Sequence, residues 1–211
     1  MRLKSRVKLM WVTPKAEELI AYMARVSNPE NQQNTETAPK LLKYLMKHQH
    51  WSPFEMVNVC MEIECTRDIA RQILRHRSFS FQEFSQRYAI SQEFDTSELR
   101  LQDPKNRQSS LECDDEDLSL HWDVKQNTAL SKALEAYDWA LEHGVAKEVA
   151  RKVLPEGLTM SRMYMNGTLR SWIHYTQIRC GEETQKEHRE VAVQCERILT
   201  ELFPNLFINR S

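Results

Sequence analysis

The stretch RQILRHRSFSFQEFSQRY occupies residues 71–88 and is the densest group of functional side chains in the chain. Four arginines, one histidine, three serines and a glutamate lie between Arg71 and Arg87. A guanidinium binds phosphate oxygens in a two-pronged geometry and also stacks on flat rings. Helical spacing would place Gln72, Arg75 and His76 on one side of a helix, followed by an irregular polar segment. This arrangement suits a phosphorylated planar ligand, although charge-rich segments are often only solvated faces.

The overall composition excludes several classes of protein. The 211 residues include 29 Lys+Arg and 30 Asp+Glu, so the net charge of −1 weighs against a general polyanion binder. Only 4 glycines occur, and neither GxGxxG nor a Walker A motif is present, which weighs against a glycine-rich phosphate loop. No apolar run reaches the roughly 18–20 residues that span a bilayer, and the N-terminal residues MRLKSRVKLMWVTPK lack the apolar region of a secretory signal. We therefore expect a cytoplasmic protein with no membrane partner.

The cysteines and histidines give no sign of a disulfide framework or a metal site. The cysteine count is odd and no pair has CxxC spacing, which favours reduced thiols at Cys60, Cys65, Cys113, Cys180 and Cys195. His48, His50 and Glu55 are the only candidate metal ligands, and their spacing matches no standard set. We expect no metal.

Hydrophobic periodicity predicts a single α+β domain, with a small antiparallel sheet and several long helices, over residues 1–211. Strands are expected over 6–12 and 56–66, and the second should bury one face. A first helix should begin at Thr13-Pro14 and end near 27–29. Further helices are expected over about 38–48, 67–76, 123–143, 145–153, 161–175 and 184–203, and 92–119 should be a polar surface excursion.

The spacing of the functional residues within 75–88 identifies a motif, which the overall composition does not. Arg75-His76-Arg77, seven further residues and then Ser85 form an RHR-x7-S pattern. The longer stretch RHRSFSFQEFSQRY resembles the motif RHRxxSxNExSxRY of the flavin-dependent thymidylate synthases. It matches at every fixed position except Gln82, where that family usually has Asn.

The resemblance extends over most of the chain, in the same order and with similar spacing. The matching segments are ARVS at 24–27, HWSPFE at 50–55, ARKVLP at 150–155, LRSW at 169–172, QIR at 177–179 and QKE at 185–187. Two stretches, 92–119 and 156–167, carry no matching segment.

The resemblance implies an enzyme that converts dUMP to dTMP. It would take the one-carbon unit from methylenetetrahydrofolate and its electrons from NADPH through FAD. It also implies an α+β fold and a homotetramer whose active sites draw on several subunits, with small-molecule substrates rather than nucleic acid as partners.

Site residues follow from the resemblance, position by position. FAD contacts are implied for Ser52, Arg75, His76, Arg77, Glu83, Thr168, Leu169, Arg170 and His174, the last being a position where the family often has Asn. Substrate contacts are implied for Gln72, Ile73, Leu74, Arg75, Glu83, Phe84, Ser85, Gln86, Arg87, Arg151 and Arg179, with Arg151 expected from a neighbouring subunit. The catalytic residues would be Arg179 and Ser85.

Elementary chemistry supports these two roles in different ways. A fixed guanidinium beside N3 and O2 of uracil stabilises the anion that activates the ring, as an oxyanion hole does. Taken alone, however, an arginine such as Arg179 is more often an ordinary ion pair at a helix end. Ser85 has no evident base triad in the sequence, so we expect it to hydrogen-bond the substrate rather than attack it.

Two other functions stay open at this level. Phe79, Phe81 and Phe84 interleave the charges of Arg75–Arg87, as in a stacking platform for nucleic acid, which predicts steeply salt-dependent binding. A catalytically inactive nucleotide sensor on the same fold would keep the motif, and only turnover separates it from the enzyme.

Overall fold

The computed structural model describes residues 5–91 and 93–207, and the chain divides into two compact units. Unit 1 contains Ser5 and residues 64–75, 83–91 and 93–163, whereas unit 2 contains residues 6–63, 76–82 and 164–207. The first four residues of the N-terminal stretch discussed above, and Gln92, lie outside the described residues. The expectation of a single domain stays a prediction.

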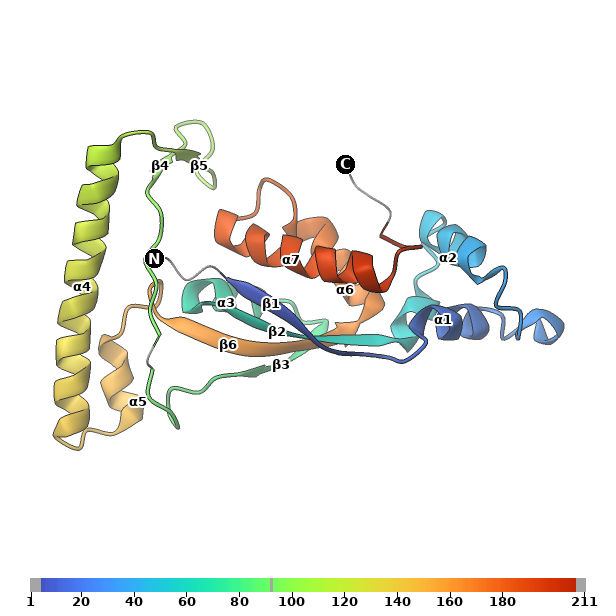
Figure 1. Ribbon diagram of the computed structural model, residues 1–211, viewed down its shortest axis with the longest axis horizontal. Helices are drawn as coiled ribbons and strands as arrows, with labels where there is room; N and C mark the ends of the chain where they lie inside the picture. Colours follow the sequence, from blue (N-terminus) through green and yellow to red (C-terminus); the bar gives the residue numbers. More distant parts are fainter. Residues whose placement is uncertain (1–4, 92, 208–211) are drawn as a thin grey trace. The chain divides into compact units, whose positions relative to one another are not determined.

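A four-stranded sheet with the order β1-β2-β6-β3 is the central element (Figure 1). Its strands are β1 (Arg6–Val12), β2 (Asn58–Thr66), β6 (Met160–Thr168) and β3 (Phe79–Glu83). β2 and β6 each run from one unit into the other along the chain.

Backbone hydrogen bonds at the strand ends show that neighbouring strands are antiparallel. Thr13 N, just after β1, donates to Asn58 O at the start of β2 at 3.0 Å. Leu169 N, just after β6, donates to Val57 O at 2.9 Å. Phe84 N, just after β3, donates to Arg162 O near the start of β6 at 2.8 Å. The predicted small antiparallel sheet is confirmed.

The alternation in β2 produces the buried face that the sequence predicts. The side chains that share this face are fully buried, namely Val57, Val59, Met61, Ile63 and Cys65. The preceding turn differs from the prediction, because Thr13 does not cap the first helix. Its Oγ1 accepts from Asn58 N at 2.9 Å and so joins β1 to β2. Helix α1 (Ala16–Ala24) begins instead after Lys15, which has a left-handed backbone with φ of 53°.

The prediction of a helix over 161–175 is wrong in its first half. Residues 160–168 form β6, and Ser161, Met163, Met165 and Gly167 alternate with more exposed neighbours. Methionine is a good helix former, but helix propensity is a weak preference, and pairing with β2 and β3 overrides it. The helix α6 starts at Leu169 and ends at Arg179, with the Thr168 side chain accepting from Ser171 N at its N-terminus.

The segment after His76 is also more regular than predicted. Helix α3 ends at Ile73. The expectation that Arg75 and His76 lie on a helix is therefore wrong. Residues 79–83 then form β3 rather than an irregular segment. The alternation of FSFQE has the period of a strand, and Ser80 points away from the side that Phe79 buries.

A glycine allows β3 and β6 to pack closely. A Cβ atom added at Gly167 would lie 2.4 Å from the Phe79 ring, far inside contact distance. The ring therefore occupies the space above the glycine, and this contact positions the strand that carries Phe79, two residues after the RHR sequence.

In unit 2, helices α6 and α7 (Lys186–Leu202) pack against each other on the sheet (Figure 1). Trp172 of α6 is fully buried and its Nε1 donates to Val59 O at 3.0 Å. Val7 N of β1 donates to Gln194 Oε1 of α7 at 3.2 Å. Helices α1 and α2 (Ala38–Lys47) and the 3-10 turns η1 (Pro29–Asn31) and η2 (Ser52–Met56) complete this unit.

Unit 1 is dominated by the long helix α4 (Glu116–Glu142), which starts before the predicted Asp123. The Asp115 carboxylate accepts from Leu118 N at 2.9 Å, and Glu116 and Asp117 occupy the first turn. The acidic stretch thus stabilises a helix N-terminus. Gly144, with φ of 75°, ends the helix as predicted.

The remaining elements of unit 1 are short. They are α3 (Arg67–Ile73), the antiparallel hairpin β4 (Arg100–Gln102) and β5 (Ser110–Glu112), α5 (Lys147–Ala150) and η3 (Arg151–Val153). The hairpin agrees with the predicted polar excursion over 93–115, whereas residues 116–119, which the prediction included, belong to α4. No helix among the described residues is long and apolar enough to cross a membrane.

Candidate active site

The residues implied by the motif divide between the two units. Unit 1 holds most of the substrate positions, namely Gln72, Ile73, Leu74, Arg75, Glu83, Phe84, Ser85, Gln86, Arg87 and Arg151. Unit 2 holds most of the cofactor positions together with one catalytic position, namely Ser52, His76, Arg77, Thr168, Leu169, Arg170, His174 and Arg179.

In unit 2 the structure brings Arg179 to the motif histidine, 103 positions away in the sequence. Arg179 Nε donates to His76 Nε2 at 2.9 Å. Arg179 is the last residue of α6, where the negative end of the helix dipole favours a cation. Within residues 5–91 and 93–207 Arg179 forms no ion pair with a carboxylate, so it is not an ordinary helix-end ion pair.

The hydrogen bond from Arg179 also determines the state of the His76 ring. A guanidinium is a donor only, so Nε2 must be unprotonated and the proton of the neutral ring lies on Nδ1. Burial, with the charges of Arg179 and His174 adding to it, lowers the pKa of His76 to about 4. His76 is therefore neutral at pH 7 and leaves the positive charge of Arg179 uncompensated.

Aromatic rings surround the His76–Arg179 pair. The His76 ring makes edge contacts with Tyr175 at 5.0 Å and Phe79 at 6.5 Å between centroids. The ring centroid of His188 lies 6.3 Å from that of His76, also in an edge contact, and His188 is fully buried. Tyr175 and His188 are functional candidates that the sequence analysis missed, because no motif marks them.

A second cluster in unit 2 holds Arg170 at the start of α6. Arg170 Nη1 donates to Glu55 Oε1 at 2.6 Å, and Thr168 Oγ1 donates to Glu55 Oε2 at 2.8 Å. The hydrogen bond from Arg170 lowers the pKa of Glu55, against an opposing effect of burial. Two implied cofactor positions are thus joined by one carboxylate. Glu55 was missed as a site residue although it ends the HWSPFE segment.

The other implied cofactor positions of unit 2 are more open. The side chains of Ser52, Arg77 and His174 are exposed, and Leu169 is buried in the core. In unit 1 the side chain of Arg75 is also exposed. Among the described residues, neither Arg75 nor Arg77 pairs with a carboxylate, so both guanidinium groups keep their capacity for an anionic ligand.

In unit 1 Glu83 lies in a closed network of ion pairs. Glu83 pairs with Arg67 at 3.7 Å and with Arg71 at 3.3 Å, and Glu156 pairs with the same two arginines at 3.3 and 3.0 Å. Ser161 Oγ also donates to Glu83 Oε1 at 2.9 Å. The Arg67 side chain is only 8% exposed. Arg67 and Glu156 were not identified from the sequence, where each resembles an ordinary surface charge.

The segment after Glu83 is ordered by local hydrogen bonds. Ser85 O accepts from Tyr88 N and Ala89 N, both at 3.1 Å. Gln86 is buried, and its Nε2 donates to Ser91 Oγ at 2.8 Å. Arg87 pairs with Glu148 at 3.3 Å in an exposed position. The Phe84 side chain is exposed at the edge of a cavity of about 170 Å³ that Ser161 and Arg162 also line.

The remaining substrate positions form the end of α3 and the start of η3. Gln72 and Leu74 are half-buried and Ile73 is fully buried, while Gln72 O accepts from Arg75 N at 3.3 Å. Arg151 is half-buried at the first position of η3. Within the described part of unit 1, its guanidinium makes no hydrogen bond to another implied substrate position.

The cysteines do not supply a nucleophile near the motif. Cys60, Cys65 and Cys195 are buried, as predicted, and all five cysteines are free thiols. Burial, with Asp68 and Glu83 adding to it, raises the pKa of Cys65 to about 12. Ser85 Oγ accepts from Arg87 N at 3.4 Å, and in the described parts of the chain no basic side chain is bonded to it.

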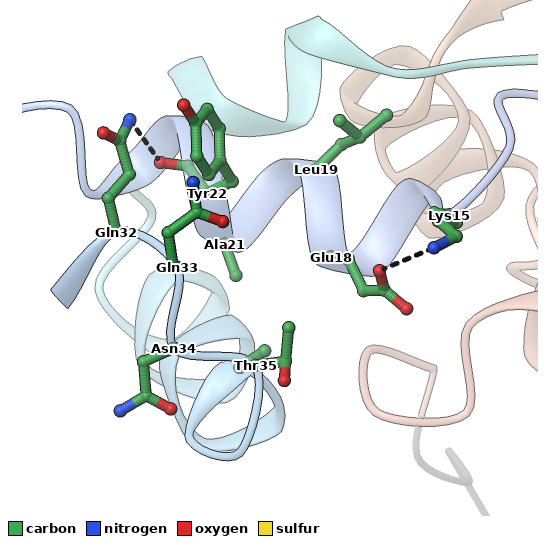
Figure 2. A pocket seen from close by; sticks show the side chains of 10 residues that line it. Lys15, Glu18, Leu19, Ala21, Tyr22, Gln32, Gln33, Asn34 and Thr35 are labelled. Carbon is green, nitrogen blue, oxygen red and sulfur yellow. Dashed lines mark hydrogen bonds and ion pairs between the residues drawn. The ribbon is translucent and has the colours of Figure 1, made fainter.

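One further pocket, of about 150 Å³, lies in unit 2 between α1 and residues 32–35. Figure 2 shows the Lys15–Glu18 ion pair at 3.8 Å and the bond from Gln32 Nε2 to Tyr22 O at 3.3 Å at its edges. None of the implied site residues lines it. No group of three or more His, Cys, Asp or Glu side chains suited to a metal ion is found among the described residues.

Comparison with known proteins agrees with the motif. Residues 8–205 match the family described as thymidylate synthase complementing protein. A probable flavin-dependent thymidylate synthase of Paramecium bursaria Chlorella virus 1 is 50% identical over 192 residues, covering 90% of this chain and 88% of the relative. The flavin-dependent thymidylate synthase of Synechocystis sp. is 50% identical over 190 residues, covering 90% and 87%.

A solved structure extends the match to the fold. The UMP/dUMP methylase PolB from Streptomyces cacaoi, bound with 5-Br dUMP, has a TM-score of 0.85 at 27% identity and covers 98% of this chain and 94% of that chain. The fold and the motif thus define a flavin-dependent methyltransferase of dTMP biosynthesis. The chain belongs to the flavin-dependent thymidylate synthase family, which confirms the resemblance and FAD as the cofactor.

Proposed function

We propose that the substrate is dUMP, that methylenetetrahydrofolate donates the carbon, and that NADPH is the source of electrons. The observation that carries this proposal is Arg179, a guanidinium with a fixed Nε and no carboxylate partner in the described structure. PolB, which has the same fold, is a UMP/dUMP methylase, and this supports a uridine-type monophosphate as the substrate.

The residues of unit 2 fit a flavin nucleotide in their chemistry. FAD is a pyrophosphate with a flat ring, and phosphate oxygens are best bound by arginines that carry no competing carboxylate. Arg77 meets this condition, whereas Arg170 is already paired with Glu55. Thr168 and Arg170 lie at the N-terminus of α6, where the helix dipole favours anions. When bound, FAD supplies the hydride chemistry that reduces the transferred carbon.

We propose that the substrate contacts come from unit 1. Gln72 and the segment Glu83–Arg87 would bind the nucleotide through side chains and main-chain groups. The ion pairs of Glu83 and the buried Gln86 hold this segment in place, so its backbone is ordered before the substrate arrives. Arg151 would reach the phosphate from a neighbouring subunit.

Arg179 would promote catalysis by stabilising negative charge on the uracil ring. Its Nε is used by His76, which leaves the two Nη groups to face N3 and O2 of the base. Because His76 is neutral, the full positive charge acts on the ring, and electron density rises at C5. The aromatic surroundings exclude water and strengthen this interaction.

We propose that Ser85 is a hydrogen-bonding residue near the reacting carbon and not a nucleophile. Its Oγ accepts from Arg87 N, and no base activates it within the described residues. The buried Cys65 thiol, with its raised pKa, has no role in the proposed reaction.

A homotetramer is supported by the exposed surface of unit 1. Large apolar side chains are exposed along α4 and the elements after it, namely Leu120, Trp122, Val124, Trp139, Val149 and Val153. A depression of about 580 Å³ lies among Trp139, Val145, Val149 and Val153. Exposed apolar surface of this kind is typical of an interface between subunits.

Free thiols at all five cysteines support a cytoplasmic location.

The test is an absorption spectrum of the purified protein, followed by anaerobic titration with NADPH and an assay of dTMP formation. We expect flavin bands that NADPH bleaches faster when dUMP is present, and dTMP only when methylenetetrahydrofolate is added. Flavin reduction without dTMP would indicate a nucleotide sensor. Absence of flavin bands after addition of FAD would contradict the proposal, and salt-dependent binding of oligonucleotides would then be measured.

A further inference from the structure

A buried polar pair lies behind the His76–Arg179 pair in unit 2. His188 of α7 is 0% exposed, and its Nε2 lies 3.1 Å from the hydroxyl oxygen of Tyr175, which is also fully buried. An imidazole and a phenol at such positions lose their contacts with water and are tolerated only when they bond to each other or to other groups. Apolar residues would fill this core without that cost.

The position of the two side chains links them to the proposed catalytic arginine. Tyr175 precedes Arg179 by four residues, so the two lie on the same face of α6. The Tyr175 ring contacts the His76 ring at 5.0 Å, and the His188 ring contacts it at 6.3 Å, both edge-on. The centroids of Tyr175 and His188 are 5.9 Å apart, so the three rings form a triangle.

We infer that Tyr175 and His188 are positioning residues, which act through the His76 ring to hold the Arg179 guanidinium in its productive orientation. This inference rests on the proposed role of Arg179. The two residues touch neither the proposed substrate nor the cofactor in our assignment. Their hydrogen bond fixes the orientation of both rings, and these rings confine His76.

Electrostatics supports the same arrangement. Burial lowers the pKa of His188 to about 4, and the charge of Arg179 acts in the same direction. A neutral His188 adds no positive charge beside the guanidinium. Two neutral imidazoles therefore form a polar but uncharged support for a single cation.

The first experiment compares Tyr175→Phe with the wild-type enzyme. The substitution removes only one hydroxyl, so the packing of the ring is kept. We expect kcat to fall about tenfold, because small misplacements of a catalytic group are costly. The KM for dUMP and the amount of bound FAD should change less than about twofold, since neither ligand loses a contact.

The second comparison uses the histidine. His188→Gln can still hydrogen-bond to Tyr175, whereas His188→Leu cannot, so we expect Gln to keep most of kcat and Leu to lose as much as Tyr175→Phe. The matched control on the same helix is Thr200→Val, which removes the bond from Thr200 Oγ1 to Glu196 O at 2.8 Å and should leave kcat unchanged. Unchanged kcat in Tyr175→Phe, or equal losses in His188→Gln and His188→Leu, would overturn the inference.

A readout that needs no turnover separates this inference from the proposed function. Histidine-selective ¹⁵N labelling reports the protonation of Nε2 and Nδ1 in each of the 7 histidines. In the wild type, His76 should show an unprotonated Nε2 at pH 7, and in Tyr175→Phe it should show mixed tautomers. A His76 signal that is identical in both proteins would overturn the positioning role even if no dTMP were formed.

Discussion

Arginine is held in two different ways in the two units. In unit 1, Arg67 and Arg71 are each bound by both Glu83 and Glu156, so their charges are compensated. In unit 2, Arg179 is held by the neutral imidazole of His76 and keeps its charge. The residue type is the same, but the partner decides whether the side chain stabilises the protein or remains available to a ligand.

Burial explains why the charges of the Arg67–Glu83 network are compensated. The Arg67 side chain is 8% exposed and that of Glu83 is 16% exposed, so an unpaired charge there would be costly. A neutral histidine partner leaves Arg179 poorly compensated, which is unfavourable for folding. Such an arrangement is typical of functional sites, where stability is lost in favour of activity.

The largest expected effect is that of Arg179→Ala. Removing one group that stabilises developing charge typically lowers kcat by about 10²–10³-fold. The FAD content should stay near that of the wild type, because our assignment gives Arg179 no cofactor contact. Stopped-flow measurement of flavin oxidation with methylenetetrahydrofolate and dUMP would check it. Near-normal turnover in a flavin-loaded variant would mean that Arg179 belongs with the structural arginines.

Arg67→Met is expected to lower the stability of the protein. It leaves Glu83 and Glu156 each short of one partner in a partly buried network, so the free energy of unfolding should fall by about 2–3 kcal/mol. Urea denaturation would measure this loss. The control is Lys15→Met, which breaks the exposed Lys15–Glu18 pair and should not change the midpoint. Equal midpoints for the two variants would show that the network adds nothing to stability.

A third substitution tests the contact that positions β3. Gly167→Ala places a methyl group against the Phe79 ring and should lower the free energy of unfolding by about 1–3 kcal/mol. Gly157→Ala is the control, because a Cβ there has its nearest neighbour 4.0 Å away. If thermal melts of both variants match that of the wild type, the packing of Phe79 on Gly167 is looser than described.

Unit 2 should also show a pH dependence of stability. The pKa values of His76 and His188 are lowered from an ordinary 6.5 to about 4, so between these values the unfolded chain binds more protons than the folded one. Stability should therefore fall as the pH decreases from about 6.5 toward 4, and be regained above 6.5. Denaturation at pH 7 and pH 5 would measure it.

The control for this effect keeps the rest of the protein unchanged. His121 is exposed on α4, so His121→Gln should keep the full pH dependence. His188→Gln should reduce it, because one of the two buried imidazoles is removed. If His188→Gln has the same pH dependence as the wild type, other groups cause the loss at acid pH.

The sequence predicted the features that depend on neighbours along the chain. The alternation of β2, the C-terminal glycine of α4 and the core positions of Cys60, Cys65 and Cys195 follow from local periodicity. The RHR-x7-S spacing identified the family, because a long motif with fixed positions is rare by chance. The same local reasoning failed for β6 and β3, where sheet pairing overrides weak helical or irregular preferences.

The roles of individual arginines could not be decided along the chain. Arg67 meets Glu156 across 89 positions, and Arg179 meets His76 across 103. Only the folded chain determines whether a guanidinium lies beside a carboxylate or beside a neutral ring, because these contacts are made by residues from distant elements. The sequence alone therefore determined which family and which cofactor, whereas the tertiary structure decided which charges are compensated by a carboxylate and which are not.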